Sequence, residues 1–275
     1  MYSTIMVNLE LFQDCTRLLK ITGDLAERFE ADVIGVSASQ PIQVVYDAGA
    51  LCGEVVELDR SEVEAGMRTA EQQFRAAFAH RAHRIEWRSQ VAVESPSEYV
   101  ARQMRGADLL ITGAGPNGLV LNNTRRVNTS DLIMQAGRPV LIVPASVELL
   151  AAKHIVVGWK DTREARRAVF DALPLLKAAS RVTIIKIAEY EDLAEARANA
   201  EDVVQWLHRH GIKAESISVP ASGDGASQLE AIARNTGADL IVAGAYGHSR
   251  FREWALGGVT LELLQHAGIC TLMSH

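Results

Sequence analysis

The chain has 275 residues, enough for two domains of ordinary size, and its 48% hydrophobic and 23% charged residues are typical of a folded globular protein. A net charge of −6 excludes a general nucleic-acid binder, which needs a basic face to replace the counterions of phosphates. The three cysteines lack the C-x-x-C spacing of a metal site. No cationic segment precedes the first apolar stretch, as it would in a secretion signal, and no apolar run approaches the roughly 18 residues of a membrane span. We therefore expect a cytoplasmic protein that binds neither nucleic acid nor a membrane and has no cysteine-based metal site.

The first half of the chain alternates short apolar runs with helical patterns. The apolar runs predict strands at residues 4–9, 31–38, 84–93, 106–114 and 139–144. Apolar residues at helical spacing predict helices at residues 11–29, 61–81 and 96–105, and a further helix around Asp131. Residues 42–59, which include Gly49 and Gly53, are predicted to form a surface loop.

The second half has the same order of elements. Strands are predicted at residues 154–159, 182–188, 213–220, 237–245 and 269–274. Helices are predicted at residues 163–178, 193–210, 226–236 and 259–267, and a short hinge at residues 145–152 joins the halves.

An internal repeat links the two halves. Residues 106–114 read GADLLITGA and residues 237–245 read GADLIVAGA, at an offset of 237 − 106 = 131 that continues without a gap to Ala136-Gly137 and Ala267-Gly268. Apolar strands separated by helix-length segments indicate parallel sheets that are covered on both faces. The sequence therefore predicts two tandem, doubly wound α/β domains, 1–147 and 152–275, each with a five-stranded parallel sheet. Ligands should bind at the carboxyl ends of the strands, near the topological switch point.

A glycine-rich segment follows the fourth strand of the second half. It contains Gly244 and Gly247, then Arg250 and Arg252, and Gly257-Gly258 before the last predicted helix. Glycines let backbone N–H groups approach a ligand, and a helix N-terminus supplies unpaired donors and partial positive charge. The segment therefore predicts a site for a polyphosphate.

These features resemble the universal stress protein family, whose nucleotide-binding members carry G-x-x-G, nine residues, and then G-[S/T]. Here Gly244-x-x-Gly247 is followed by nine residues, 248–256, and then Gly257. The strings GAYGHSR, WKDTREA and GGVT look like the tandem bacterial branch of that family, and the resemblance spans essentially the whole chain. It implies a Rossmann-like fold of the adenine nucleotide alpha hydrolase-like kind.

The resemblance also implies a ligand, ATP or a related adenine nucleotide, with or without Mg. The candidate contacts are Gly244, Gly247, His248, Arg250, Gly257, Gly258, Val259, Lys160, Asp161 and Ala188. Two of these depart from the family pattern. Gly258 stands where the motif has Ser or Thr, and Lys160 aligns with the family's Asp that holds the ribose or adenine end, so Lys160 could meet a phosphate instead.

The N-terminal copy has lost the glycines of this motif. At the offset of 131, Pro116 stands opposite Gly247, and Arg126 and Val127 stand opposite Gly257 and Gly258. Proline has no N–H to donate and valine is branched where a ligand must approach. We therefore expect a degenerate partner domain that could bind a different ligand.

Other patterns carry less weight. Residues 113–118 match G-x-G-x-x-G, but they follow the fourth strand of their half and open no clean helix, so dinucleotide binding is not favoured. His208 and His210 diverge on a helix and do not form a metal pair. Trp254 is a possible wall of the pocket, and Gly223 lies in a turn that borders the nucleotide in the family.

Three functions remain open. The leading one is a stress-response regulatory or ligand-binding protein that holds ATP in its C-terminal half and hydrolyses it slowly at most. The alternative is a scaffold that binds a partner or an apolar metabolite between the halves, and the third is a nucleotide hydrolase. No catalytic constellation is visible. The resemblance implies that the last strands, residues 139–144 and 269–274, join the halves as an internal pseudo-dimer, and two chains could associate further as a homodimer.

Overall fold

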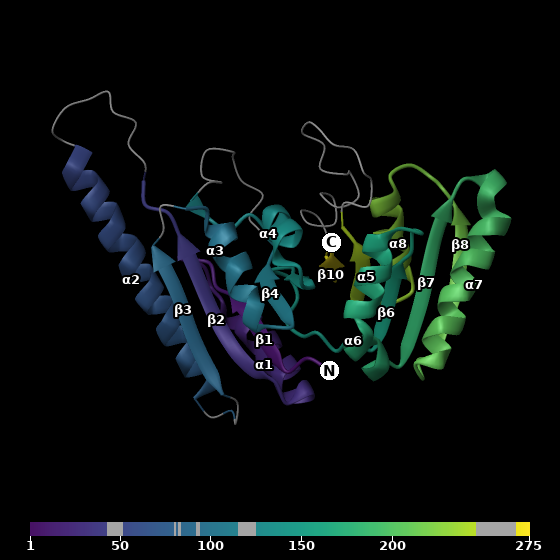
Figure 1. Ribbon diagram of the computed structural model, residues 1–275, viewed down its shortest axis with the longest axis horizontal. Helices are drawn as coiled ribbons and strands as arrows, with labels where there is room; N and C mark the ends of the chain where they lie inside the picture. Colours follow the sequence, from purple (N-terminus) through teal and green to yellow (C-terminus); the bar gives the residue numbers. More distant parts are fainter. Residues whose placement is uncertain (43–51, 80, 82–83, 92–93, 115–124, 246–267) are drawn as a thin grey trace. The chain divides into compact units, whose positions relative to one another are not determined.

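A computed structural model describes residues 1–42, 52–79, 81, 84–91, 94–114, 125–245 and 268–275. Contacts within the chain divide it into two compact units, residues 2–136 and residues 137–275, the second of which also includes Met1. Each unit is an α/β structure with helices packed on a mostly parallel sheet (Figure 1), which confirms the fold class that the sequence predicts.

The described residues of the N-terminal unit form four parallel strands. Its elements are β1 (Thr4–Asn8), α1 (Thr16–Phe29), β2 (Asp32–Ser39), α2 (Cys52–Phe78), β3 (Ile85–Val91), α3 (Pro96–Gln103), the 3-10 helix η1 (Met104–Gly106), β4 (Leu109–Gly113) and α4 (Thr129–Ala136). The strand order is β3-β2-β1-β4. Helix α1 packs against α2, and α3 packs against α4. Helices α1 and α2 connect β1 to β2 and β2 to β3, so right-handed crossovers place both helices on one face of the sheet. Helix α3 connects β3 to β4 in the opposite direction across the sheet, so α3 and α4 cover the other face.

In the C-terminal unit, six strands lie within the part of the chain that the structure describes. Its elements are β5 (Val140–Val143), β6 (His154–Gly158), α5 (Arg163–Asp171), α6 (Leu173–Ala178), β7 (Arg181–Ala188), the 3-10 helix η3 (Tyr190–Asp192), α7 (Leu193–Arg209), β8 (Ala214–Pro220), α8 (Gly225–Asn235), β9 (Leu240–Gly244) and β10 (Cys270–Ser274). Strands β10-β9-β6-β7-β8 are parallel. Strand β5, which the repeat assigns to the first half, pairs antiparallel with β10 and is grouped with this unit.

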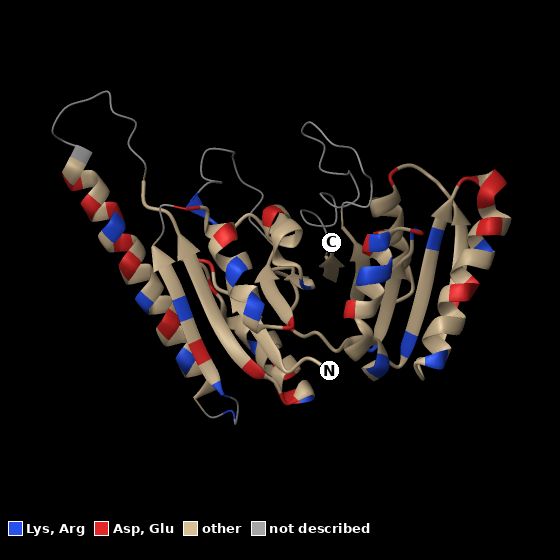
Figure 2. Ribbon diagram, viewed as in Figure 1, with Lys and Arg blue, Asp and Glu red and all other residues tan. Residues whose placement is uncertain are grey.

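The buried residues explain why the strands form. The central strands β6 and β9 are apolar without alternation, and Ile155, Val156, Leu240 and Ile241 are fully buried, as expected for strands covered on both faces. Charged side chains lie mainly on the helices (Figure 2). Along α2 they form i,i+4 ion pairs such as Arg60–Glu64, which support an exposed helix face.

Three predicted elements differ from the structure for local reasons. The helix expected at residues 163–178 is divided into α5 and α6 because Pro174 has no N–H to continue the first helix. Helix α1 begins only at Thr16, because Phe12 has a φ of 60° and the Asp14 carboxylate accepts the N–H of Thr16. Residues 52–59, which we predicted as part of a loop, belong to α2.

The repeated aspartate has the same structural role in both units. Asp108 accepts the N–H groups of Ser3 and Thr4 at 2.7 and 3.1 Å. Asp239 accepts those of Lys153 and His154 at 3.0 and 3.2 Å. Each carboxylate thus binds the backbone at the start of a central strand, β1 in the N-terminal unit and β6 in the C-terminal unit. The repeat of this aspartate is therefore explained by sheet assembly.

Asp239→Ala should lower the free energy of unfolding by about 1–3 kcal/mol, because two backbone donors lose a charged acceptor. Urea denaturation followed by circular dichroism measures the change. The control is Asp202→Ala on the exposed face of α7, which should change stability by less than about 0.5 kcal/mol. Equal effects of the two substitutions would contradict the assigned role.

Candidate functional site

The topological switch point of the C-terminal unit lies between β6 and β9. Strand order β10-β9-β6-β7-β8 reverses direction there, and open α/β sheets bind ligands outside the carboxyl ends of the strands at such a point. Gly158 ends β6 and Gly244 ends β9. The segment after β6 and the glycine-rich segment after β9 therefore begin at neighbouring positions of the same edge.

Four of the predicted contacts are within the described residues, and all four lie at this edge. Lys160 and Asp161 follow β6, Ala188 ends β7 and Gly244 ends β9. The structure thus brings together the carboxyl ends of the three strands that carry them. The other predicted contacts, Gly247, His248, Arg250, Gly257, Gly258 and Val259, lie outside the described residues, as do Trp254 and the predicted helix 259–267.

Two lysines give this edge a positive character. Lys160 is exposed, and its pKa lies below the ordinary lysine value because partial burial disfavours the charge and because Lys186 on β7 repels it. The carboxylate of Asp161, the next residue, forms an ion pair with Arg166 of α5. An anionic group placed beside Lys160 would relieve this repulsion.

Lys186 also belongs to a row of residues that runs across the sheet at this edge. Ser274 pairs with Gly244, and Lys186 pairs with Ser218. Gly158 pairs with both Ala243 and Ile185. The next residues along these three strands, Trp159, Gly244 and Lys186, are therefore in register as well. Residues in register point to the same face of a sheet.

Three polar atoms in this row are buried and have no hydrogen-bond partner among the described residues. They are Trp159 Nε1, Ser218 Oγ and Ser274 Oγ. Buried polar groups are normally paired, so each is a candidate for contact with a ligand, a water molecule or another part of the chain.

Gly244 has a packing role that the sequence did not indicate. A Cβ at this position would lie 2.5 Å from the backbone nitrogen of Ala165, at the first turn of α5. That turn is held by Thr162, whose hydroxyl oxygen accepts the N–H of Ala165 at 3.3 Å. The absence of a side chain at Gly244 therefore lets α5 lie directly on the end of β9, and its contact with a ligand stays a prediction.

The N-terminal unit has an equivalent edge with the opposite charge. The N–H of Leu9 donates to the carbonyl of Val36 at 2.9 Å, as that of Trp159 donates to Ile185 at 2.8 Å. These matching bonds place Glu10 at the position of Lys160, and Ser39 at that of Ala188. Glu10 was not predicted from the sequence, because the single offset of 131 does not align β1 with β6. Aligning the halves strand by strand would have found it.

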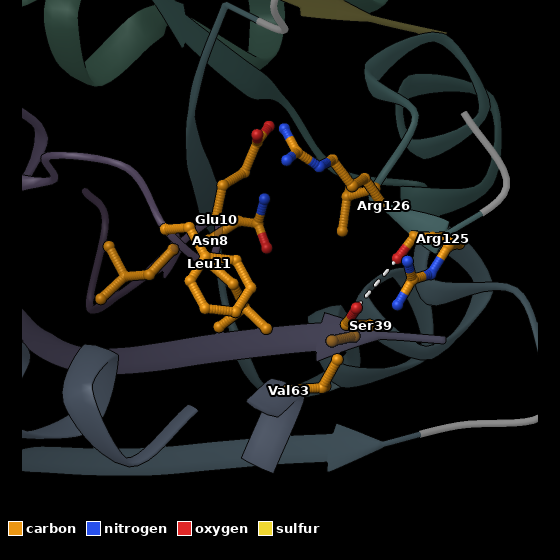
Figure 3. A pocket seen from close by; sticks show the side chains of 11 residues that line it. Asn8, Glu10, Leu11, Ser39, Val63, Arg125 and Arg126 are labelled. Atoms are coloured by element: carbon orange, nitrogen blue, oxygen red, sulfur yellow. Dashed lines mark hydrogen bonds between the residues drawn. The ribbon is translucent and has the colours of Figure 1, made fainter. Parts of the chain in front are cut away.

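A cavity of about 90 Å³ opens at this edge of the N-terminal unit (Figure 3). It is lined by residues after β1, by the end of β2, by Val63 of α2 and by residues 125–127. Arg125 holds the last of these segments in place. Its Nη2 donates to both carboxylate oxygens of Asp59 at 2.6 and 2.7 Å, and its carbonyl accepts the Ser39 hydroxyl at 3.1 Å.

Glu10 and Arg126 face one another across this cavity (Figure 3). Burial raises the pKa of the Glu10 carboxyl above its ordinary value, and the charge of Arg126 opposes that rise. Glu10 Oε2 accepts a hydrogen bond from Gln13 Nε2 at 2.7 Å. The cavity thus presents a partly desolvated carboxylate and a guanidinium on opposite sides.

Two other kinds of feature, a membrane span and a metal site, are absent from the described residues. None of the helices there combines the length and apolarity that crossing a bilayer requires. Within the same residues, no three His, Cys, Asp or Glu side chains gather as a metal site would require.

A model of a known protein family, described as the Universal stress protein family, matches residues 151–275. No curated protein matches the chain.

Solved structures share the fold of the whole chain. A universal stress protein from Archaeoglobus fulgidus DSM 4304 superposes with a TM-score of 0.74 at 13% identity, over 98% of this chain and 97% of its own. A protein of unknown function from Pseudomonas aeruginosa PAO1 gives a TM-score of 0.62 at 14% identity, over 99% and 92% of the two chains. A putative universal stress protein from Pseudomonas aeruginosa UCBPP-PA14 gives 0.60 at 13% identity, over 99% and 93%. At these identities the similarity establishes the fold alone.

Gly244→Ala should destabilise the protein by about 1–3 kcal/mol, because the new methyl group would collide with the α5 backbone. The repeat supplies a matched control, since a Cβ at Gly113 would meet no atom of the described residues within 4 Å. Urea unfolding of both variants tests this difference. The packing role would be wrong if Gly113→Ala were as destabilising as Gly244→Ala.

Glu10→Gln should raise the melting temperature at pH 7. Because the folded-state pKa of Glu10 is raised, the stability linked to its protonated form is lost as the pH rises through that value, and glutamine removes the cost of the buried charge. The groups around Glu10 are Arg126, which favours its ionised form, Gln13, and Cys15, a thiol whose pKa of about 11 keeps it neutral.

We expect a gain of roughly 1–4 °C at pH 7 that shrinks toward pH 4. Differential scanning calorimetry across this pH range measures it, with Glu62→Gln on the exposed face of α2 as the control. A lower melting temperature of Glu10→Gln at pH 7 would show that the carboxylate stabilises the fold.

Proposed function

Because residues 151–275 belong to the universal stress protein family, and the whole chain has the fold of a universal stress protein, we propose that this protein is a tandem universal stress protein that binds ATP or another adenine nucleotide in its C-terminal half. The domains proposed are residues 1–147 and 152–275, which follow the internal repeat. The observation that carries the proposal is the glycine motif of Gly244, Gly247 and Gly257, which begins at the switch point of the sheet.

The chemistry of this edge supports an anionic ligand. Strand β9 ends at Gly244, so the glycine-rich segment starts beside the residues that follow β6. Backbone N–H groups of such a segment suit phosphate oxygens. Lys160 and Lys186 add positive charge at the same edge. A phosphate near Lys160 would reduce the repulsion between the two ammonium groups.

Lys160 also changes the orientation that we propose for the nucleotide. An ammonium group cannot accept a hydrogen bond from a ribose hydroxyl or an adenine amino group. Lys160 would therefore contact a phosphate oxygen, and the adenine base would lie at the apolar end of β7 near Ala188. Mg would neutralise part of the charge of the phosphates.

The function proposed is regulatory. ATP occupancy would favour one arrangement of the protein or one binding partner, to the extent that the nucleotide binds that state more tightly. Hydrolysis would be slow at most. We further propose that the last strands of the two halves join them as an internal pseudo-dimer, which the antiparallel pairing of β5 with β10 supports.

Isothermal titration with ATP, with and without Mg, tests the proposal on the full chain. The unmodified protein should bind one equivalent, and Gly247→Val should weaken binding at least about tenfold because a branched side chain blocks the phosphates. Lys160→Ala should weaken it by a smaller factor. The control is Lys177→Ala, at the exposed end of α6.

The proposal fails if the unmodified protein releases no heat with ATP, or if Gly247→Val binds as tightly as the unmodified protein. Thermal unfolding of each variant verifies that a loss of binding is not a loss of fold. Turnover of ATP faster than about one per second would place the protein among enzymes instead of binding proteins.

A further inference from the structure

A buried residue that lines the cavity of the N-terminal unit has a hydrogen-bond acceptor with no donor among the described residues. Asn8 at the end of β1 is 99% buried, since its relative exposure is 1%. Its Nδ2 donates to Thr112 Oγ1 at 3.2 Å. Asn8 lines the cavity, and its Oδ1 has no partner among the described residues. Because buried carbonyl oxygens are normally paired, this oxygen is a candidate acceptor for an N–H or O–H group of a molecule in the cavity.

Glu10 supplies a second acceptor beside Asn8. One carboxylate oxygen, Oε2, is occupied by Gln13, and Oε1 has no hydrogen-bond donor among the described residues. The side chains of Asn8 and Glu10 lie side by side in Figure 3, with Arg126 opposite the end of Glu10. The cavity therefore has two acceptors on one side and a cationic donor on the other.

Apolar side chains form the remaining wall. Leu11 and Val63 are buried, and the exposed Phe12 also lines the cavity. Phe12 is held with a φ of 60°, and its ring lies against α2, where a Cβ at Gly66 would be 3.0 Å from it. A bulky residue with positive φ is strained, and such strain often accompanies binding sites.

The described residues of the same unit differ from those that would hold a phosphate chain. Arg126 and Val127 replace the glycine pair of the other half. The first turn of α4 has lost two of its donors, because Asn128 Oδ1 accepts the N–H groups of Ser130 and Asp131 at 2.9 and 3.1 Å. The cavity is also much smaller than the 300–1,000 Å³ of sites for larger ligands. Its occupant is therefore small and carries its own donors.

We propose that the cavity binds a small α-amino acid or a solute of that chemical class, with its amino group held by Asn8 Oδ1 and Glu10 and its carboxylate held by Arg126. The ammonium group satisfies the buried acceptors and compensates the charge of Glu10. The carboxylate satisfies the guanidinium, and a short aliphatic side chain contacts Leu11 and Val63. This site is independent of nucleotide binding in the C-terminal half.

Three matched probes test the proposal on the full-length protein. L-alanine carries both charged groups, ethylammonium carries only the amine, and propionate carries only the carboxylate. In saturation-transfer difference NMR, the methyl group of L-alanine should receive the strongest signal, ethylammonium a weaker one, and propionate a signal near background.

Variants then assign the contacts. Glu10→Gln should weaken L-alanine binding at least about tenfold, as expected for the loss of a charge-assisted hydrogen bond. Arg126→Gln, a substitution of an exposed residue that should not disturb folding, should weaken it severalfold without changing ethylammonium binding. Glu62→Gln on α2 should bind L-alanine as the unmodified protein does.

No signal from L-alanine, an equal signal from propionate, or unchanged L-alanine binding in both Glu10→Gln and Arg126→Gln would overturn the proposal. ATP binding in the C-terminal half should be unchanged in these variants, so the two proposals fail separately.

Discussion

The parallel sheet is the constraint on which both sites depend. Because all strands of a βαβ unit run in one direction, the residues that follow them gather at a single edge, whatever ligand the protein binds. In the two units the residues after β1 and β6 are placed by the same backbone hydrogen bond, from Leu9 to Val36 and from Trp159 to Ile185. The backbone thus fixes a position, and the side chain after it, Glu10 or Lys160, sets the charge presented there.

The two units use this position in opposite ways. In the C-terminal unit Lys160 and Lys186 make the edge positive, and the chain that leaves β9 is rich in glycine. In the N-terminal unit Glu10 and the carbonyl oxygen of Asn8 present acceptors, and Arg126 stands where the other half has Gly257. A duplicated scaffold with opposite charges at corresponding points favours a division of roles between the halves.

The sequence predicted the order of elements and the fold class, because strand and helix patterns are local and occur twice. It did not predict the break at Pro174 or the extension of α2 over residues 52–59, since a proline near a helix start and a glycine inside a helix are each compatible with several structures.

For the candidate site, the sequence placed Lys160, Asp161, Ala188 and Gly244 near one another, and the structure brings the strand ends that carry them to one edge. It did not identify Glu10, because the extra residues in the first half shift the alignment of β1 and β2, and only an alignment made strand by strand corrects for that shift. Nor could it show that Gly244 makes room for α5, which depends on packing.

Backbone-amide NMR of the full-length, isotopically labelled protein during a titration with Mg-ATP tests the central claim most directly, because it reports on both edges at once. If the halves divide their roles by charge, shift changes should concentrate at the ends of β6, β7 and β9, around Lys160, Ala188 and Gly244, and residues 8–12 should not respond. Changes centred on Asn8 and Glu10, or equal changes at both edges, would contradict the account.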